Sequence, residues 1–459
     1  MTAAPKKLPD GPLVAWLGDD FTGSSAVLEA LAFAGLPSVL FLDIPSDEQL
    51  ARFPGMRGIG IASIARSQGP AWMDAHLPPA FDWLAARRAP ITHYKVCSTL
   101  DSSPEIGSIG KAIDIAAPRF AAPWIPCLIA APANRRYQVF GHLFASAPGG
   151  VFRLDRHPVM ARHPVTPMDE SDVAKHLARQ TDRPIGLIDV EILEGNAGAD
   201  AALRELSDRG AEIISLDCLS EIHLARAGKL IWEHRGPGLF VVGSQGLEHA
   251  LIAHWRDAGL LAAVDPPESA GAVERMVAVS GSVSPVTAAQ IAWAEENGFE
   301  IIRLDAARMI GGDAGPERGA LDAALAALDA GHDPLILTAR GPDDPAIAAT
   351  RAAALRQAVT EDVANARIGE ALGRLLADIL KKTGLRRAAI SGGDTSGYAC
   401  RQLDLIAFTA RAPTIPGAAL LTAHSQDAGL DGLELALKGG QMGSPDFFGW
   451  IKRGGGSAP

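Results

Sequence analysis

Short apolar runs alternate with longer segments of helical spacing along most of the chain. The runs have the length of buried strands, and the segments between them place apolar residues on one face. In the first half we expect strands at Leu13–Leu17, Ser38–Leu42, Gly58–Ala62, Thr92–Cys97, Ile185–Ile188, Glu212–Ser215 and Gly238–Val242. This alternation is typical of a mostly parallel sheet that helices cover on both faces.

Two helices of the first half have recognisable ends. The segment Ser24–Ala34 carries its apolar residues on one face, and Gly35 follows as a stop signal. The segment Pro104–Ala116 starts with a proline, which often opens helices, and Ser103 before it is a candidate cap. We therefore expect one helix soon after the first strand and another after the strand that ends near Cys97.

A polar, proline-rich stretch divides the chain. With 459 residues the protein is too long for a single core, so two domains are expected. The stretch Asp265–Gly271 is the candidate boundary and gives domains of residues 1–265 and 272–459. Beyond it we expect strands at Met276–Val279, Glu300–Leu304, Pro334–Leu337 and Ala388–Ile390, helices at Gly319–Ala330 and Pro345–Val359, and a surface loop at Arg308–Arg318. The fold class is therefore α/β, with two domains that each hold a mostly parallel sheet flanked by helices.

The charge of the chain narrows the range of partners. A formal net charge of −11 disfavours nucleic acid and anionic membranes, and an anionic substrate must be bound by local cationic groups. No uncharged apolar run reaches the roughly 18 residues of a membrane span, the N-terminus lacks a signal-peptide pattern, and the four cysteines form no CxxC pair. We expect a reduced, cytoplasmic protein. The sequence leaves the oligomeric state open and allows a homo-oligomer.

Two adjacent carboxylates lie between a strand end and a helix start. They are Asp19 and Asp20, in the segment Gly18–Gly23. The helix dipole stabilises anions there, and one carboxylate could accept a proton from a substrate hydroxyl while the other orients its neighbours. The alternative is structural, because Asp20 or Thr22 could simply cap the helix. Spacing alone does not separate these two interpretations.

A hydroxyl-rich loop follows the strand that ends near Cys97. Lys95 lies close to the strand end, and Ser98, Thr99 and Ser102 supply short hydroxyl groups. This set suits a small polyhydroxy carboxylate, with Lys95 binding the carboxylate. In the structural alternative Lys95 is a surface lysine with a partly buried stem, and Cys97 is a small buried hydrophobe rather than a nucleophile.

Three glycine-rich turns follow expected strands of the second half. They are Ser280–Thr287, Gly392–Thr395 and Lys438–Gly443. Backbone amides at a helix start, with glycines that allow close approach, can bind a phosphate, although the chain lacks a P-loop sequence. Asp394 could hold Mg²⁺ through water. The alternative is that all three are ordinary tight turns.

These segments occur in the order seen in the four-carbon acid sugar kinase family, which the chain resembles from about Val14 to Phe448. The resemblance implies an N-terminal sugar-acid-binding domain, a C-terminal nucleotide-binding domain, an active site in a cleft between them, and phosphorylation of an acid sugar with ATP and Mg²⁺. The family's aspartate pair falls on Asp19 and Asp20, and its substrate arginine falls on Arg66.

The residues and the resemblance together give a candidate site. The catalytic candidates are Asp20 and Asp19. The substrate-binding candidates are Asp20, Arg66, Lys95, Cys97, Ser98, Thr99 and Ser102. The nucleotide-binding candidates are Ser280, Ser282, Gly392, Gly393, Asp394, Thr395, Lys438, Gly439 and Gly440, with Asp394 also the metal candidate.

The substrate loop departs from the family pattern, in which Lys-Lys-x-Asp-Ser-Thr-Leu-Arg-Gly is common. Cys97 stands where the pattern has Asp, and Asp101 and Ser102 stand where it has Arg and Gly. Losing a cation and gaining an anion changes how a carboxylate or a terminal hydroxyl is held. We therefore expect an ATP-dependent kinase of a small acid sugar, such as threonate, erythronate, an oxotetronate, or a branched or oxidised relative.

Two other functions stay open. A dehydrogenase or isomerase could act on a similar acid, but the chain has no Rossmann GxGxxG turn in the right place. A non-catalytic or differently specific protein could bind the acid sugar and the nucleotide on the same fold, and the altered substrate loop allows it.

Overall fold

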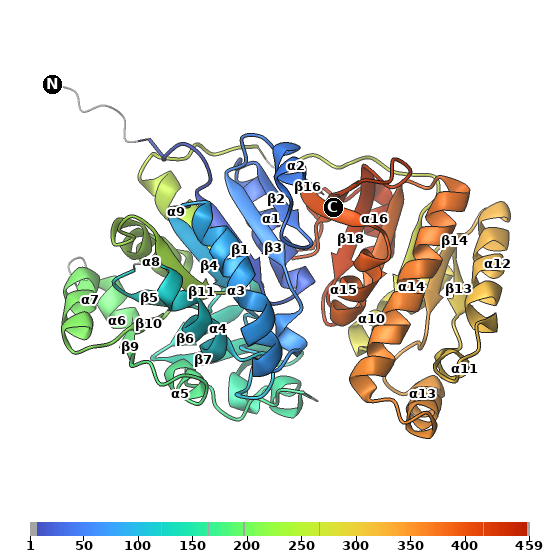
Figure 1. The fold of residues 1–459 in the computed structure, drawn as a ribbon, viewed down its shortest axis with the longest axis horizontal. Coiled ribbons are helices and arrows are strands. Elements are labelled where there is room, and N and C mark those ends of the chain that lie inside the picture. Colours follow the sequence, from blue (N-terminus) through green and yellow to red (C-terminus); the bar gives the residue numbers. More distant parts are fainter. Residues whose placement is uncertain are drawn as a thin grey trace. The chain divides into compact units, whose positions relative to one another are not determined.

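The chain divides into two compact units, Met1–Asp265 and Pro266–Pro459, and each holds a run of neighbouring strands (Figure 1). The computed structural model describes residues 7–120, 122–163, 165–195, 198–265, 267–415 and 417–456, and for Asp394 it describes the backbone alone. Among these residues no helix is both long enough and apolar enough to cross a membrane.

The first unit is built on a parallel sheet with the strand order β2-β3-β1-β4-β11-β5-β10-β9. Most of these strands are short apolar runs that are buried on both faces, as expected for parallel strands under helices. Their bounds are β1 Val14–Gly18, β2 Ser38–Phe41, β3 Gly58–Ala62, β4 Ile91–Lys95, β5 Ile125–Leu128, β9 Ile185–Ile188, β10 Ile213–Leu216 and β11 Leu239–Gly243. The strands predicted for this half are confirmed, with ends that shift by at most two residues.

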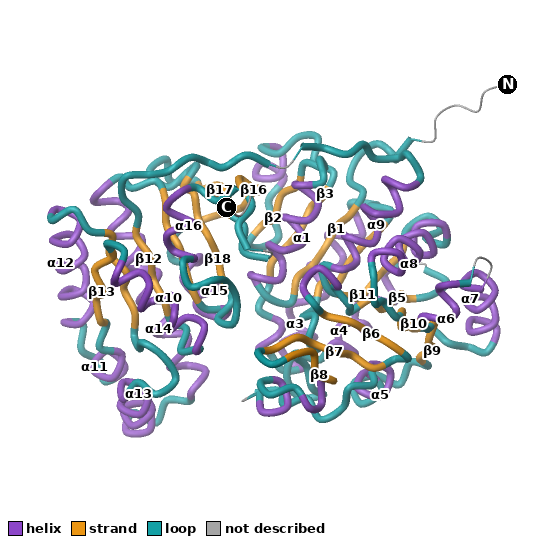
Figure 2. The backbone as a smooth tube through the Cα atoms, turned by 180° about the vertical axis from the view of Figure 1, so that it is seen from behind, coloured by secondary structure: helices purple, strands orange, loops and turns teal. Residues whose placement is uncertain are grey.

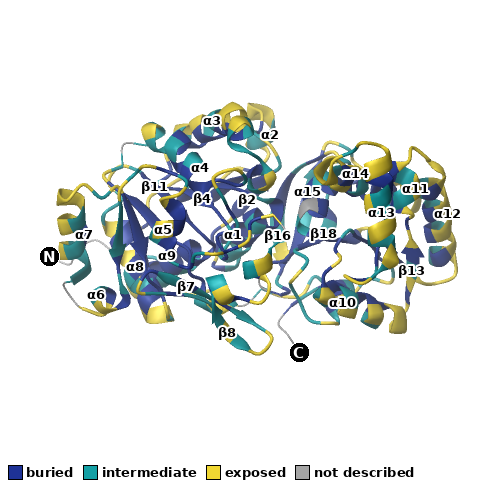
Figure 3. Cartoon of the chain, turned by 90° about the horizontal axis from the view of Figure 1, so that it is seen from below, coloured by how far each residue is buried: buried dark blue, intermediate teal, exposed yellow. Residues whose placement is uncertain are grey.

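Helices cover both faces of this sheet. Helices α3 and α4 pack together on one face, whereas α1, α8 and α9 pack together on the other, and the strands between them are buried (Figure 3). The helices are α1 Phe21–Phe33, α2 Asp47–Ala51, α3 Pro70–Ala86, α4 Ile109–Ala116, α5 Val173–Leu177, α6 Val190–Glu194, α7 Gly198–Asp208, α8 Glu221–Glu233 and α9 Gly246–Asp257.

The helix predicted at Pro104–Ala116 begins later than expected. Its cap is Ser108, whose side chain accepts a first-turn amide at 3.1 Å, and not Ser103. Gly107 has a φ of +64°, a left-handed conformation that cannot continue a helix. Ser103 instead accepts the amide of Ile106 within a local turn. The sequence signal of serine followed by proline therefore marked a turn and not a helix start.

A separate three-stranded antiparallel sheet, β6-β7-β8, lies within the first unit (Figure 2). Its strands are β6 Arg136–Val139, β7 His142–Ala147 and β8 Gly150–Arg153. It is attached at the carboxyl end of β10, where the backbones of Gln138 and Cys218 exchange hydrogen bonds of 3.0 and 2.9 Å. The buried carboxylate of Asp217 also accepts the Gln138 amide and the backbone amide of Gly141. No expectation from the sequence covered this element.

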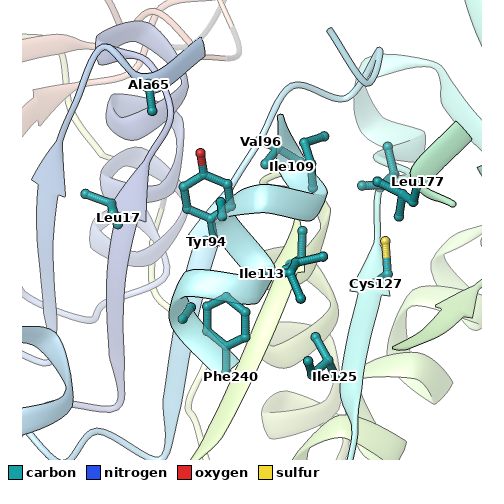
Figure 4. Close-up of a cluster of buried hydrophobic side chains, with 14 of the residues drawn as sticks. Leu17, Ala65, Tyr94, Val96, Ile109, Ile113, Ile125, Cys127, Leu177 and Phe240 are labelled. Carbon is teal, nitrogen blue, oxygen red and sulfur yellow. The ribbon is translucent and has the colours of Figure 1, made fainter. Parts of the chain in front are cut away.

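The core beneath the strand ends of the first unit is apolar. Tyr94 of β4 lies beside Ile109 and Ile113 of α4, and Phe240 of β11 lies below it (Figure 4). Cys127 belongs to the same cluster and is fully buried. Packing of this kind holds the strands in register, so the turns at their carboxyl ends have fixed positions.

The second unit has the strand order β13-β14-β12-β15-β18-β17-β16. Strands β13, β14, β12, β15 and β18 are parallel to one another, whereas β17 is antiparallel to both β18 and β16. The bounds are β12 Val277–Ser280, β13 Phe299–Arg303, β14 Asp333–Leu337, β15 Arg387–Ser391, β16 Leu405–Ala412, β17 Leu420–Ser425 and β18 Leu433–Lys438. The predicted strands are again confirmed, and the antiparallel pair β16 and β17 was not foreseen.

Helices also cover both faces of the second sheet. Helices α10 and α16 contribute to a core on one face, and α12, α14 and α15 pack together on the other. The helices are α10 Pro285–Glu296, α11 Ala306–Ile310, α12 Gly315–Asp329, α13 Pro345–Arg356, α14 Glu361–Thr383, α15 Gly393–Arg401 and α16 Phe447–Arg453. The predicted helices at Gly319–Ala330 and Pro345–Val359 are confirmed as α12 and α13.

The surface loop predicted at Arg308–Arg318 is wrong, because α11 extends into it and α12 begins within it. Asp305 caps α11 by accepting the backbone amide of Arg308 at 3.0 Å. The guanidinium of Arg308 pairs with Asp313 at 2.6 Å. Within the predicted loop, Arg308 therefore belongs to α11 and forms an ion pair with Asp313, which lies between the two helices.

The loop that follows β4 is fastened to α5 by a buried hydrogen-bond network. The hydroxyl of Ser102 donates to the Leu100 carbonyl at 2.9 Å and lies 2.9 Å from His176 Nε2. The side-chain amide of Gln180 donates to Ser102 and to His176, both at 3.0 Å. Burial lowers the pKa of His176 to about 4, so its ring is neutral at pH 7 and can accept the Gln180 hydrogen bond.

We predict that His176 makes the first unit sensitive to acid. The folded protein binds a proton at this ring less readily than the unfolded chain does, so the stabilisation is complete above about pH 6.5 and is lost as the pH falls toward 4. Between pH 7.5 and pH 5 the wild type should lose about 2 kcal/mol more unfolding free energy in urea than His176→Asn does. The exposed His76→Asn is the control and should follow the wild type. Parallel pH curves for wild type and His176→Asn would contradict the prediction.

Candidate active site

The carboxyl ends of four neighbouring strands align at one edge of the first sheet. Gly18 of β1 is the register partner of Ala62 of β3 and of Lys95 of β4, and Lys95 in turn is the partner of Gly243 of β11. The turns that follow these strands therefore emerge side by side. This edge carries the predicted segment Gly18–Gly23, as expected for a ligand site in an open α/β sheet.

Arg66 joins the two adjacent aspartates at this edge. It lies in a short 3₁₀ turn, Ala65–Ser67, after β3. Its guanidinium binds Asp19 through two nitrogens, at 2.6 and 3.1 Å, and binds Asp20 through the third at 2.8 Å. The backbone amide of Arg66 also donates to the Asp19 carbonyl at 2.9 Å. The three residues that sequence reasoning singled out thus form one ion-paired cluster.

Asp20 is also the cap of α1. Its carboxylate accepts the backbone amide of Gly23 at 2.8 Å and the hydroxyl of Thr22 at 2.7 Å. The structural interpretation of Asp20 is therefore confirmed. Capping uses only part of its hydrogen-bonding capacity, because a carboxylate has about four acceptor positions. The side chain of Asp20 keeps 17% of its surface exposed, compared with 3% for Asp19.

Lys95 points into the same cluster and is buried. Its ammonium group donates to the Val96 carbonyl at 2.7 Å. Gly23 leaves room for it, since a Cβ atom there would lie 3.0 Å from Lys95 Nζ and 2.3 Å from the Asp20 carboxylate. The alternative of a surface lysine is wrong, because only 2% of Lys95 is exposed.

The two aspartates differ in their acidity. Burial raises the pKa of Asp19 above its usual value, and Arg66 offsets this only in part. Burial acts on Asp20 in the same direction, but Arg66 and Lys95 outweigh it and hold the pKa of Asp20 below its usual value. Asp20 is consequently a stable anion beside two cations, and it is the aspartate that a ligand can reach.

The loop after β4 presents a chain of polar groups. The Cys97 thiol lies 2.9 Å from the Thr99 hydroxyl, which donates to the Asp101 carboxylate at 2.7 Å. Burial and the Asp101 charge raise the pKa of Cys97 to about 11, so the thiol is neutral at pH 7 and is a poor nucleophile. The half-exposed side chain of Ser98 makes no hydrogen bond to the described residues. The hydroxyl of Ser102 is occupied by the network with His176.

In the second unit, three polar side chains lie in one row beneath the glycine-rich turns. Ser280 of β12 is the register partner of Ser391 of β15, and Ser391 is the partner of Lys438 of β18. Register partners in parallel strands point to the same face. All three side chains are fully buried, and within the described part of the chain the hydroxyls of Ser280 and Ser391 have no hydrogen-bond partner.

Lys438 is buried, and the described side chains give it no carboxylate within salt-bridge distance. Its ammonium group donates to the Gly439 carbonyl at 2.9 Å and to the Thr287 hydroxyl at 3.2 Å. Burial lowers the pKa of Lys438 to about 8. Ser284 and Thr287, in the first turn of α10, donate to the carbonyl of Gly440 and hold the third glycine-rich turn against this helix.

The turns after β12 and β15 are in close contact through Thr395. A Cβ atom on Gly281 would lie 2.3 Å from the Thr395 hydroxyl, and one on Gly392 would lie 2.7 Å from it. Gly392 also has a φ of +128°, which side chains rarely adopt. The backbone amide of Gly392 donates to the Lys438 carbonyl at 2.8 Å, so all three turns are joined.

Other residues predicted to bind the nucleotide lie at the same three turns. Gly393 begins α15, and a Cβ atom on Gly440 would lie 2.8 Å from the Ser282 hydroxyl. The side chain of the metal candidate Asp394 lies outside the described residues. Within those residues no cluster of three or more His, Cys, Asp or Glu side chains is present.

Sequence reasoning did not select Ser391 and Thr287. Both belong to the motifs that drew attention to the turns, and both are buried next to selected residues. The strand register, which places Ser391 between Ser280 and Lys438, was not readable from the chain.

Comparisons with known proteins agree with this division into two units. A family model described as a sugar-binding N-terminal domain matches residues 14–251. A second, described as a nucleotide-binding C-terminal domain, matches residues 277–448. Each match includes the strand-end turns of one unit.

Relatives match along nearly the whole chain. A 3-oxo-isoapionate kinase of Paraburkholderia graminis is 46% identical over 449 residues, which cover 97% of this chain and 95% of the relative. A 3-oxo-tetronate kinase of Methylobacterium radiotolerans is 32% identical, over 94% of this chain and 97% of the relative. A solved structure from Salmonella typhimurium LT2 is 27% identical, covers 96% of this chain and 98% of its own, and has a TM-score of 0.77. The chain belongs to the four-carbon acid sugar kinase family.

Proposed function

We propose that the protein is an ATP-dependent kinase that phosphorylates a hydroxyl group of 3-oxo-isoapionate or a closely similar 3-oxo acid sugar. The observation that carries the proposal is the ion-paired cluster of Asp19, Asp20 and Arg66 at one sheet edge, with the buried Lys95 ammonium group beside it. The 46% identity to a 3-oxo-isoapionate kinase supports this choice of substrate.

In this proposal the first unit binds and orients the acid sugar. Asp20 accepts the hydrogen of the attacking hydroxyl, which turns an oxygen lone pair toward the phosphate. Asp19 holds Arg66 in place, because it is buried and binds the guanidinium through two hydrogen bonds. Arg66, Lys95, Cys97, Ser98 and Thr99 surround the sugar, whereas Ser102 positions the loop through its bonds to α5.

The second unit binds the nucleotide. The backbone amides of the turns at Ser280–Ser282, Gly392–Thr395 and Gly439–Gly440 face the phosphates in this proposal, because amides at helix starts favour anions. Among the described residues, the buried hydroxyls of Ser280 and Ser391 have no partner and the buried Lys438 has no ion pair, which fits an anionic ligand. Mg²⁺, held by Asp394 together with the phosphates, would neutralise charge that develops during transfer.

The division of roles follows from the chemistry of phosphoryl transfer. Most of the rate enhancement comes from positioning and from electrostatic stabilisation, with little covalent chemistry for the protein to perform. Asp20 has a lowered pKa, so it acts better as an orienting acceptor than as a strong base in the ground state. We therefore assign its effect to alignment of the hydroxyl.

The substrate can be identified by an assay of ADP release. The purified chain is incubated with ATP, Mg²⁺ and a panel of 3-oxo-isoapionate, 3-oxotetronates, threonates and erythronates. We expect the highest kcat/KM with 3-oxo-isoapionate. Nucleotide binding without turnover on any member of the panel would instead favour the non-catalytic alternative.

Asp20→Asn should lower kcat by about 10²- to 10⁴-fold, because it removes the anionic acceptor of the hydroxyl hydrogen. Asparagine is also a good helix cap, so α1 should stay folded. The dissociation constant for ATP, measured by calorimetry, should stay within about twofold. Asp189→Asn, which makes the same change at the cap of α6, is the matched control and should retain wild-type kcat. Near-normal turnover of Asp20→Asn would remove Asp20 from the reaction.

Gly392→Ala should weaken ATP binding by at least about tenfold. The added methyl group meets the Thr395 hydroxyl at 2.7 Å, and φ at this position is +128°, so the turn must deform. Gly319→Ala, on the exposed face of α12 with no atom within 4 Å of the new Cβ, is the control. It should leave ATP binding unchanged and raise the unfolding free energy by about 0.5–1 kcal/mol. Equal ATP affinities of the two variants would contradict the assignment of this turn.

A further inference from the structure

The cations of the ion-paired cluster are already engaged by protein groups. All three guanidinium nitrogens of Arg66 bind Asp19 or Asp20. Lys95 donates to a backbone carbonyl and lies close to Asp20. The two positive and two negative charges of this cluster cancel. The adjacent loop adds the carboxylate of Asp101, so these groups together would repel an anionic sugar.

A further cation, Arg136, lies near this loop. It is the first residue of β6 and is two positions before Gln138, so both side chains point to the same face of the strand. Gln138 binds Ser215 at 2.8 Å and Asp217 at 3.1 Å, at the carboxyl end of β10. The face of β6 that carries Arg136 is therefore turned toward the carboxyl edge of the parallel sheet, where the site lies.

The guanidinium of Arg136 is incompletely satisfied. One terminal nitrogen donates to the Asn134 and Arg135 carbonyls, at 3.1 and 3.3 Å, and to the Ser146 hydroxyl at 3.2 Å. Its Nε is buried and has no hydrogen-bond partner among the described residues. Those residues also give it no carboxylate within salt-bridge distance, whereas Asp19, Asp20 and Arg66 pair closely. A buried donor without an acceptor is unfavourable, and a bound anion would relieve it.

The charges around Arg136 indicate where that anion would lie. Burial lowers the pKa of Arg136, and the Cys97 and Asp101 side chains act on it in the opposite direction through space. Both residues belong to the loop that follows β4, so the Arg136 guanidinium lies in the neighbourhood of that loop, on the β6 face that Gln138 turns toward the sheet edge. With Arg136 included, three cations balance the three carboxylates of Asp19, Asp20 and Asp101.

We propose that Arg136 binds the carboxylate group of the acid sugar, through its Nε and a terminal nitrogen, and thereby selects acids over neutral sugars. The proposal rests on the proposed acid sugar kinase function. In the loop after β4, Asp101 stands where the family pattern has arginine, so the loop lacks a cation there. In this proposal Arg136 of β6, a strand of the small antiparallel sheet, supplies that cation. An arginine fork matches a planar carboxylate in two parallel hydrogen bonds, which lysine cannot reproduce.

The test measures carboxylate selectivity in Arg136→Gln, Arg136→Lys and the control Arg135→Gln. Arg135 is the exposed neighbour, so its variant makes the same charge change without the proposed contact. The probes are 3-oxo-isoapionate and its carboxamide, each with ATP and Mg²⁺. Arg136→Gln should raise the KM for the acid by about 10- to 100-fold and leave the KM for ATP within about twofold. Arg136→Lys should recover part of the loss, and Arg135→Gln should change the KM for the acid by less than about threefold.

The carboxamide separates carboxylate binding from a structural role. In the wild type, the KM for the carboxamide should exceed the KM for the acid by about the same factor by which Arg136→Gln raises the KM for the acid. In Arg136→Gln the two KM values should be about equal. A wild-type KM for the acid in Arg136→Gln, or an equal loss for acid and carboxamide, would overturn the proposal while the kinase function stands. If the wild type shows no turnover, binding of the acid is measured by calorimetry instead. Binding by the wild type that is lost in Arg136→Gln supports the proposal. Equal binding by the two proteins, or no binding by the wild type, overturns it.

Discussion

The register of the parallel strands is the constraint on which both candidate sites depend. In the first unit it places Gly18, Lys95 and Gly243 at one level, and in the second it does the same for Ser280, Ser391 and Lys438. A parallel sheet sends every following turn to the same edge, so residues far apart in the chain meet there without any direct sequence relation. The candidate residues that these strands contribute, Lys95, Ser280, Ser391 and Lys438, are each the last residue of a strand.

Burial of charge gives the first site its character. Asp19 and Lys95 are nearly inaccessible, and each charge would be unfavourable alone. Arg66 pairs with both Asp19 and Asp20, and the Lys95 ammonium group lies close to Asp20. The cluster therefore presents one accessible anion, Asp20, on a rigid support. The second site differs: among the described residues the hydroxyls of Ser280 and Ser391 have no hydrogen-bond partner, and Lys438 donates to uncharged oxygens of Gly439 and Thr287. One site is self-neutralised and the other favours an anionic ligand.

The sequence predicted the fold class and most strands better than it predicted where helices, turns and loops begin and end. The apolar runs predicted most of the parallel strands of both units, although not β5 or β18, because a strand buried on both faces must be continuously hydrophobic. Local signals failed where a polar residue had two uses. Ser103 and Pro104 formed a turn rather than a helix start, and the loop predicted at Arg308–Arg318 contains the end of α11 and the start of α12. The small antiparallel sheet β6-β7-β8 was missed, because its strands are short and only partly buried.

The sequence by itself determined the two-unit α/β organisation and the turns that carry the candidate residues, because hydrophobic period and glycine spacing are local properties of the chain. It also contained the ambiguity of Asp20, which proved to be both a helix cap and a partner of Arg66. Only the tertiary structure decided that Lys95 is buried against the aspartates, that Ser391 lies between Ser280 and Lys438, and that the β6 face carrying Arg136 is turned toward the carboxyl edge of the sheet. These are relations across strands, and they are set by register and packing, which no single stretch of sequence contains.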